Sequence, residues 1–246
     1  MEIAAGLAVR ATGTRITFCG LDNLPVTGGA VIAINHTGYV DFLPAALAAT
    51  ERGRRMRFML KAEMGRVKIV NYLIRHTGAI PVDRRAGADA YSAAVDSLRH
   101  GELVGVYPEA TISRSFELKE FKTGAARMAQ EAGVPIVPLI VWGAQRIWTK
   151  DHPKSLGHKK IPVTVVVGEP LVATGSVDQV NALLRARMST LLDQAQRGYP
   201  APAGAYWVPH RLGGSAPTPA QARRLDEVEL AERARKRAED EATGRT

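Results

Sequence analysis

Hydrophobic residues recur along this chain with two different periods, and segments of the two kinds alternate. Short apolar runs rich in Val and Ile, typical of strands covered on both faces, occupy residues 15–19, 30–34, 56–60, 78–82, 102–107, 134–142 and 163–167. Longer stretches with apolar residues at helical spacing lie between several of them, at residues 42–49, 62–75, 88–100, 121–132 and 177–196. This alternation predicts an α/β fold with a mixed central sheet flanked by helices.

The pattern changes near the C-terminus. After Tyr199 the sequence is rich in Pro and Gly, and from about Pro219 it becomes a highly charged segment of Ala, Arg and Glu. Such a segment has few apolar residues to bury and is typical of a solvated helix or a disordered tail. We therefore expect a single catalytic domain over residues 1–212, followed by a Pro/Gly linker and a charged tail over residues 213–246.

Composition narrows the class of partner. The 246 residues include 33 Lys and Arg against 24 Asp and Glu, a formal net charge of +9, which favours nucleic acid, acidic phospholipid headgroups or phosphorylated metabolites. Aromatic residues make up only 6% of the chain, so no base-stacking platform is evident and we expect no nucleic-acid partner. The single Cys19 excludes an internal disulfide and fits a reducing cytosolic setting.

A histidine and an aspartate stand where a strand is predicted to give way to a helix, in the stretch A-I-N-H-T-G-Y-V-D-F. On one continuous helix, five residues correspond to about 500° of rotation, so His36 and Asp41 would point roughly 140° apart. The two side chains meet only if the chain turns between them, and Thr37 and Gly38 are suited to that turn. Asp41 would then fix the imidazole tautomer, while the other ring nitrogen takes a proton from a substrate hydroxyl.

The residues alone leave other interpretations of this pair open. His36 can end the strand and Asp41 can cap the helix with no catalysis, and an isolated H-x-x-x-x-D occurs often by chance. Two ligands are too few for a metal site and no third His lies at a supporting spacing, so we expect no metal. A Ser or Cys nucleophile has little support, because there is no G-x-S-x-G motif and Cys19 lacks a basic neighbourhood.

Three further blocks give the pair a context. N-H-x-x-x-x-D is followed by G-A-I-P-V-D-R at residues 78–84, V-Y-P-E-A-T-I-S-R at 106–114 and V-P-I-V-P-L at 134–139. In this order and at these separations, the four blocks resemble the glycerolipid acyltransferase family, whose members acylate glycerol-3-phosphate or lysophosphatidic acid. The resemblance covers roughly residues 14–170.

The resemblance implies a mechanism and roles for particular residues. His36 would deprotonate the acceptor hydroxyl, which attacks the thioester carbonyl of acyl-CoA or acyl carrier protein directly, while backbone N–H groups stabilise the oxyanion. Arg84 matches the arginine of the second block, which in this family helps to hold the acceptor phosphate. Glu109 matches the glutamate of the third block and would shape the site. The acyl thioester is a substrate, so the resemblance implies no cofactor.

The third block departs from the usual P-E-G-T-R-S pattern of the family. Ala110 stands in place of Gly and Ile112 in place of Arg, while Thr111 and the following Arg114 remain. Isoleucine cannot imitate the planar, bidentate phosphate donor that arginine provides. We therefore expect Arg114 or Lys122 to supply the missing charge, with Thr111 as a further substrate contact.

The acceptor that the resemblance implies by default is lysophosphatidic acid, acylated in phospholipid biosynthesis. Because Ile112 breaks the phosphate pattern, glycerol-3-phosphate, a lyso-ornithine lipid or a glycolipid remain alternatives. Two rivals belong to other classes. A thioesterase would release thiol independently of any acceptor, and a non-catalytic membrane-binding module would be unaffected by His36→Ala.

Contact with a membrane has one candidate in the sequence. The stretch R-G-R-R-M-R-F-M-L-K at residues 52–61 mixes five cations with apolar side chains, which suits an anionic surface; the ordinary alternative is a basic loop that enters a buried strand. No apolar run reaches the roughly 18 residues of a spanning helix. We expect a cytoplasmic protein, peripheral on the inner face of the cell membrane. Its partners would be an acyl thioester donor, a lysophospholipid or glycerol-3-phosphate acceptor, and an anionic membrane surface.

Overall fold

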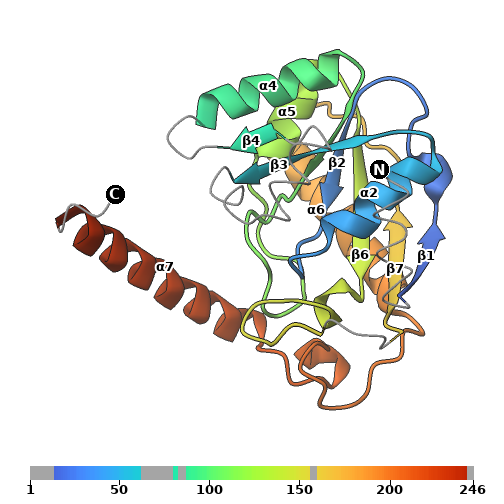
Figure 1. The fold of residues 1–246 in the computed structure, drawn as a ribbon. Coiled ribbons are helices and arrows are strands. Elements are labelled where there is room, and N and C mark those ends of the chain that lie inside the picture. The colour runs from blue at the N-terminus through green and yellow to red at the C-terminus, as the bar shows by residue number, and fades with distance from the viewer. Residues whose placement is uncertain (1–13, 62–79, 83–86, 156–159, 243–246) are drawn as a thin grey trace. The chain divides into compact units, whose positions relative to one another are not determined.

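The computed structural model describes residues 14–61, 80–82, 87–155 and 160–242. Strands in these residues form one seven-stranded sheet (Figure 1), in the order β1-β7-β6-β2-β5-β3-β4. Only β6 and β7 are antiparallel, and the other neighbouring pairs are parallel, so the mixed sheet predicted from the sequence is confirmed. The strands are β1 (Arg15–Cys19), β2 (Ala30–Ile34), β3 (Met56–Lys61), β4 (Ile80–Val82), β5 (Leu103–Val106), β6 (Ile136–Trp142) and β7 (Pro162–Val167).

Helices cover both faces of the sheet. On one face α2 (Phe42–Glu51) packs against β3, β6 and β7. On the other face α4 (Gly87–Arg99) packs against β4 and β5, α5 (Gly124–Ala132) against β2 and β6, and α6 (Val177–Gln196) against β6 and β7 (Figure 1). Short 3-10 turns occur at η1 (Leu21–Asn23), η3 (Ala144–Arg146) and η4 (His210–Leu212).

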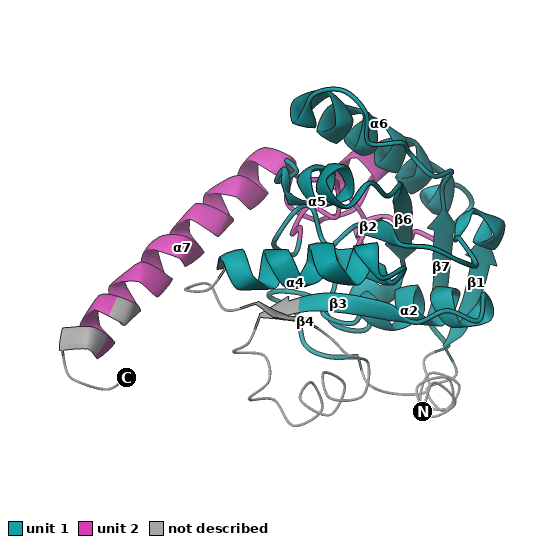
Figure 2. Ribbon diagram, turned by 90° about the horizontal axis from the view of Figure 1, so that it is seen from above, with its two compact units in different colours: residues 1–112, 120–199 teal, residues 113–119, 200–246 magenta. Residues whose placement is uncertain are grey.

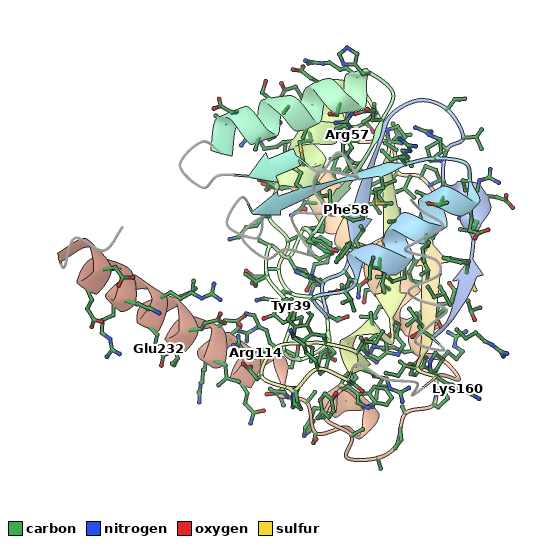
Figure 3. All side chains as sticks on the ribbon, viewed as in Figure 1. Tyr39, Arg57, Phe58, Arg114, Lys160 and Glu232 are labelled. Atoms are coloured by element: carbon green, nitrogen blue, oxygen red, sulfur yellow. The ribbon has the colours of Figure 1, made fainter. Side chains whose placement is uncertain are left out.

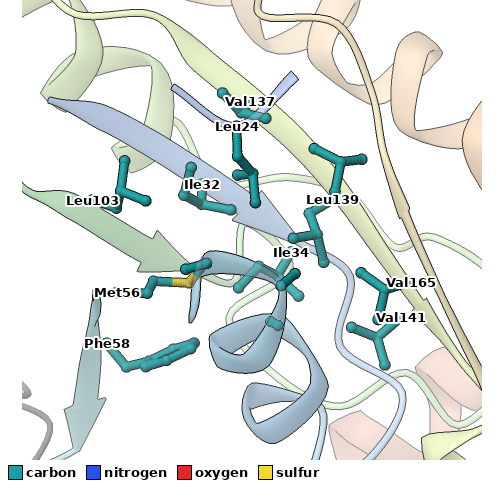
Figure 4. Packing of buried hydrophobic residues seen from close by; sticks show 14 of the residues in the cluster. Leu24, Ile32, Ile34, Met56, Phe58, Leu103, Val137, Leu139, Val141 and Val165 are labelled. Carbon is teal, nitrogen blue, oxygen red and sulfur yellow. The ribbon is translucent and has the colours of Figure 1, made fainter. Parts of the chain in front are cut away.

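The core on the α2 side shows the period of two that strands impose on their side chains. Every residue of β2 is buried, because helices cover both of its faces. Each Val or Ile side chain removed from water in this way stabilises the fold by about 1.5–3 kcal/mol. The central strands thus form a rigid platform for the loops at their ends. The cluster (Figure 4) includes Ile32, Ile34, Phe58, Leu103, Val137, Leu139, Val141 and Val165, with Ala45, Ala48 and Ala49 of α2.

Most predicted helices agree with the structure. The helix expected at 177–196 matches α6, whose start is fixed by a reciprocal capping box between Ser176 and Gln179. The helix expected from residue 121 begins later, at Gly124, because the Lys122 N–H donates to the Pro108 carbonyl and belongs to a loop. The helix predicted at residues 62–75 lies outside the described residues.

The chain forms two compact units (Figure 2). The first combines residues 1–112 and 120–199, and the second combines residues 113–119 with 200–246. The boundary predicted at residue 212 therefore falls inside the second unit, which also takes in residues 113–119, beginning with the last two residues of the third sequence block. Within the second unit the charged tail is helical, as α7 (Pro219–Ala242).

Ion pairs connect α7 to residues 113–119 within the second unit. The Arg114 guanidinium contacts Asp226 through one terminal nitrogen and Glu229 through the other, at 2.9 Å for the latter. Lys119 also contacts Asp226, and Arg233 contacts Glu229 one turn along α7. Because the Arg114 side chain is only 9% exposed, its pairs are shielded from water and stronger than ordinary surface pairs.

Candidate active site

The loop between β2 and α2 turns in a way that brings His36 and Asp41 together. β2 ends at Ile34 and α2 begins at Phe42, so the intervening residues are free of both ladders. Nδ1 of His36 lies 3.2 Å from Oδ2 of Asp41. Asp41 is fully buried, whereas the His36 side chain is 19% exposed. Asp41 therefore holds the imidazole from the protein interior, while part of the ring is open to solvent.

Asp41 organises this turn instead of capping the helix that follows. Its Oδ2 also accepts the N–H of Thr37 at 2.7 Å and of Gly38 at 2.8 Å. Its side chain makes no bond to a helix N–H, so the interpretation of Asp41 as a simple helix cap is wrong. Two backbone N–H groups and the imidazole therefore surround one oxygen of this buried carboxylate.

A second loop, which follows β6, holds the turn from the other side. The Thr149 hydroxyl donates to the Thr37 carbonyl at 2.7 Å, and the Tyr39 N–H donates to the Trp148 carbonyl at 3.0 Å. A Cβ atom on Gly38 would lie 2.8 Å from the Trp148 carbonyl oxygen, so a side chain there would push the two loops apart. The turn that His36 and Asp41 need is thus supported by residues outside all four sequence blocks.

Two further side chains fix the backbone on either side of this turn. Asn35 donates from Nδ2 to the Val141 carbonyl at 3.0 Å and accepts the Val141 N–H at 2.7 Å, which fastens the end of β2 to β6. Glu109 accepts the His36 N–H at 2.8 Å through Oε1 and is only 4% exposed. The first and third sequence blocks therefore meet at the backbone of His36.

Tyr107 supports the imidazole ring itself. Its ring stacks on His36 with centroids 4.0 Å apart and planes inclined by 21°. Burial raises the pKa of the Tyr107 phenol well above its usual value, and the charge of Asp41 adds to the effect. The phenol therefore stays neutral at ordinary pH and acts as a flat wall against which the imidazole is held. The sequence reasoning missed this residue, although it lies within the third block.

Four backbone donors of the turn are already engaged. The N–H of His36 donates to Glu109, those of Thr37 and Gly38 to Asp41, and that of Tyr39 to Trp148. These four donors form the turn, so the oxyanion donors that the resemblance implies have to come from other groups.

The other residues of the third block have different surroundings. Ile112, which stands where the family usually has Arg, is buried at 3% exposure. Thr111 lies half-buried in the same loop. Lys122 adjoins this loop through its backbone N–H, which donates to Pro108 at 2.8 Å, and its side chain is exposed. Lys122 is therefore a cation whose backbone is fixed beside the third block.

The remaining predicted phosphate contacts are Arg114 and Arg84. Arg114 belongs to the second unit, where Asp226 and Glu229 contact its guanidinium. Arg84 lies outside the described residues. Within the described ranges, no three His, Cys, Asp or Glu side chains gather as a metal site requires. The described helices include none that is long and apolar enough to cross a membrane.

Comparisons with known proteins agree with this arrangement. An acyltransferase family model matches residues 15–142. A 1-acyl-sn-glycerol-3-phosphate acyltransferase of Bacillus subtilis is 31% identical over 61% of this chain and 70% of its own length. A chloroplastic enzyme of the same name from Arabidopsis thaliana is 27% identical over 64% of this chain, which spans only 44% of that plant relative.

A solved structure matches the fold. The 1-acyl-sn-glycerophosphate acyltransferase of Thermotoga maritima superposes with a TM-score of 0.68 over 81% of this chain and 80% of its own, at 21% identity. The region that the family model matches contains His36, Asp41, Tyr107 and Glu109. On the family match and the Bacillus relative together, this chain belongs to the acyltransferase family.

Proposed function

We propose that the protein transfers a fatty acyl group from a thioester, acyl-CoA or acyl carrier protein, to the free hydroxyl of 1-acyl-glycerol-3-phosphate in phospholipid biosynthesis. The observation that carries this proposal is the His36–Asp41 pair, with Nδ1 held at 3.2 Å from a buried carboxylate. The relatives named for this reaction support the choice of acceptor.

The geometry suits direct acyl transfer. In the neutral tautomer in which Nδ1–H of His36 donates to Asp41, Nε2 carries no proton. Nε2 takes the proton of the acceptor hydroxyl while its oxygen bonds to the thioester carbonyl carbon. When the tetrahedral species collapses, the C–S bond breaks and the imidazolium returns the proton to the departing thiolate. Asp41 stabilises the imidazolium between these two steps, and no acyl-enzyme or cofactor is required.

Recognition of the acceptor phosphate is proposed to rest on Arg84 and Lys122. Lys122 is exposed and its backbone is fixed beside the third block, within which Thr111 would supply a further polar contact. Ile112 cannot replace a phosphate-binding arginine, because it has no donor and is buried. Glu109 shapes the site by holding the His36 backbone and need not touch the substrate.

The test is thiol release from palmitoyl-CoA by the purified protein. It would be followed with no acceptor and with lysophosphatidic acid, glycerol-3-phosphate or a lyso-ornithine lipid, with mass spectrometry of the products. We expect lysophosphatidic acid to stimulate release and to yield the diacyl product, and His36→Ala to abolish both. Release that ignores every acceptor would identify a thioesterase instead. Stimulation by another acceptor would keep the transferase and replace its substrate.

The site of action is proposed to be the inner face of the cell membrane, with peripheral attachment. A long-chain acceptor and its product reside in a bilayer, so the enzyme has to meet them at the lipid surface. The net charge of +9 favours anionic lipid.

A further inference from the structure

The sheet has two edges with different chemistry. β2, β3, β4, β5 and β6 run parallel, so the loops that follow β2 and β6 lie together at the carboxyl edge. β7 is antiparallel to β6, so its start, next to Lys160, lies at this edge too. Residues 52–55 precede β3 and lie at the opposite edge. In Figure 3, Tyr39 and Lys160 lie lower in the view than Arg57.

Cations at the amino edge are engaged in holding the fold. Arg52 pairs with Asp22 at 2.9 Å, and Arg57 pairs with Glu102 at 2.6 Å. Arg54 donates to three backbone carbonyl oxygens, at 2.7, 2.9 and 2.7 Å. The arginines at the start of the basic segment therefore lie toward the end of the sheet away from His36. Three of them, Arg52, Arg54 and Arg57, bind neighbouring side chains or backbone carbonyl groups.

The carboxyl edge carries an aromatic stack beside the catalytic loop. The rings of Tyr39 and Trp148 lie 4.6 Å apart, and Lys154 Nζ lies 4.0 Å from the centre of the Trp148 ring. Tyr39 belongs to the same turn as His36, and its N–H donates to Trp148. Tyr39 and Trp148 are half-buried and Lys154 is exposed. The stack thus presents two amphipathic rings and an ammonium group to the outside.

Charge on the same segment is mostly positive. The described residues of 144–160 include four cationic side chains and one carboxylate, Asp151. The cations are Arg146, Lys150, Lys154 and Lys160. Trp, Tyr and Lys are the side chains that suit the boundary between water and lipid, since each combines an apolar body with a polar end. Each Lys or Arg side chain near an anionic bilayer strengthens the electrostatic attraction between the protein and the bilayer.

We propose that this patch, made of Tyr39, Trp148 and Lys154, is the surface that contacts an anionic bilayer. The inference rests on the proposed function, because a lipid acceptor is what makes the edge that carries His36 the edge that must face the membrane. Contact here lets an acceptor pass from the bilayer to the imidazole beside Tyr39 without crossing water. Contact through residues 52–55 would place the lipid at the far edge.

Tryptophan fluorescence can test the proposal without turnover. Trp142 and Trp207 are 1% and 7% exposed, whereas Trp148 is half-buried at the proposed surface. Vesicles of brominated phosphatidylcholine with phosphatidylglycerol should quench the protein, and Trp148→Phe should remove most of that quenching. Quenching that is absent, or that persists in the Trp148→Phe variant, would overturn the proposal.

Charge reversal at the two edges supplies a matched pair of variants. Lys154→Glu should weaken binding to phosphatidylglycerol vesicles by about ten-fold, while Arg55→Glu, an exposed cation at the amino edge, should change it less than about two-fold. Equal losses, or a larger loss for Arg55→Glu, would sink the proposed surface. Circular dichroism spectra of both variants check that each is folded.

The proposed function and the proposed surface can fail separately. Acyl transfer by the wild-type protein is measured with short-chain, monomeric acceptors and donors, where no bilayer is needed. Vesicle quenching is measured without substrate. No transfer together with Trp148-dependent quenching would reject the function and keep the surface, and transfer without such quenching would do the opposite.

Discussion

The loops that follow β2 and β5 meet at His36 and yet are built in opposite ways. The first keeps an unbroken N-H-x-x-x-x-D. Its backbone N–H and carbonyl groups form hydrogen bonds with residues of the first unit, namely Asp41, Glu109, Trp148 and Thr149. The second departs from the family pattern, holds Ala110 and Phe116 in a left-handed conformation, and passes from the first unit into the second after residue 112.

This difference separates the two tasks of the enzyme. Proton transfer needs a base held in one geometry, so the loop after β2 has little freedom to vary. Acceptor recognition depends on charges around the substrate, and the loop after β5 is where this chain has changed them. We therefore expect changes in the first loop, and at Tyr107 and Glu109 that contact His36, to act on kcat, and changes elsewhere in the second loop to act on stability or KM.

The largest expected effect comes from removing the base. His36→Ala should lower kcat by about 10³-fold, since a positioned general base contributes roughly 10²–10⁴. The backbone N–H of residue 36 still donates to Glu109, and the side chain is partly exposed, so the melting temperature should stay near that of the wild type. A variant with normal acceptor-dependent turnover would remove His36 from the mechanism.

Glu109 tests where the two loops join. Glu109→Ala leaves the His36 N–H without its acceptor and should cost about 1–3 kcal/mol in the free energy of unfolding, with a lower kcat. Glu109→Gln keeps an oxygen at that place and should retain most of both. Denaturant unfolding and steady-state kinetics measure the two variants. If Gln proves as damaging as Ala, the charge of Glu109 matters, and its role is to contact substrate.

Thr149 tests the support from the loop after β6. Thr149→Val keeps the shape but loses the hydroxyl that donates to Thr37, which should cost about 1 kcal/mol of stability and lower kcat with little change in KM. Thr149→Ser restores the donor and should recover the loss. A failure of Ser to rescue would show that the methyl group, through packing, is what counts.

What the sequence alone could predict follows from the range of the interactions. Strand β2, helix α6 and the meeting of His36 with Asp41 depend on periodicity, a capping box and a turn, all of which are local. Thr149 lies 112 positions from Thr37, and the two meet because β6 neighbours β2 in the sheet. Local sequence patterns do not determine the order of strands in a sheet, so this contact could not be predicted from the sequence.

The same reason explains the acidic partners of Arg114. Resemblance assigns Arg114 to the substrate, whereas its contacts come from Asp226 and Glu229, 112 and 115 positions further along. The composition of a highly charged tail predicts a solvated segment. It does not reveal which carboxylates of the tail pair with a buried guanidinium.

Arg114→Ala separates these two roles. If Arg114 mainly holds α7, the variant should speed proteolysis of the tail by about ten-fold and leave KM for the acceptor within about two-fold. Arg233→Ala, which removes an exposed partner of Glu229 one turn along α7, is the control and should change both little. A ten-fold rise in KM for Arg114→Ala would restore it as a phosphate contact.

The smallest expected effect lies in the third block itself. Ala110 has φ 60, a left-handed conformation that costs an L-residue about 1 kcal/mol and that glycine, the usual residue of the family at this place, adopts freely. Ala110→Gly should leave activity unchanged and raise the free energy of unfolding by less than about 1 kcal/mol, because the gain is partly offset by greater freedom in the unfolded chain. Ala93→Gly, at an exposed position inside α4, should lower it by about 1 kcal/mol. Opposite signs from the same substitution would show that backbone strain is stored in the loop after β5, and two losses would show that the left-handed turn is relaxed around alanine.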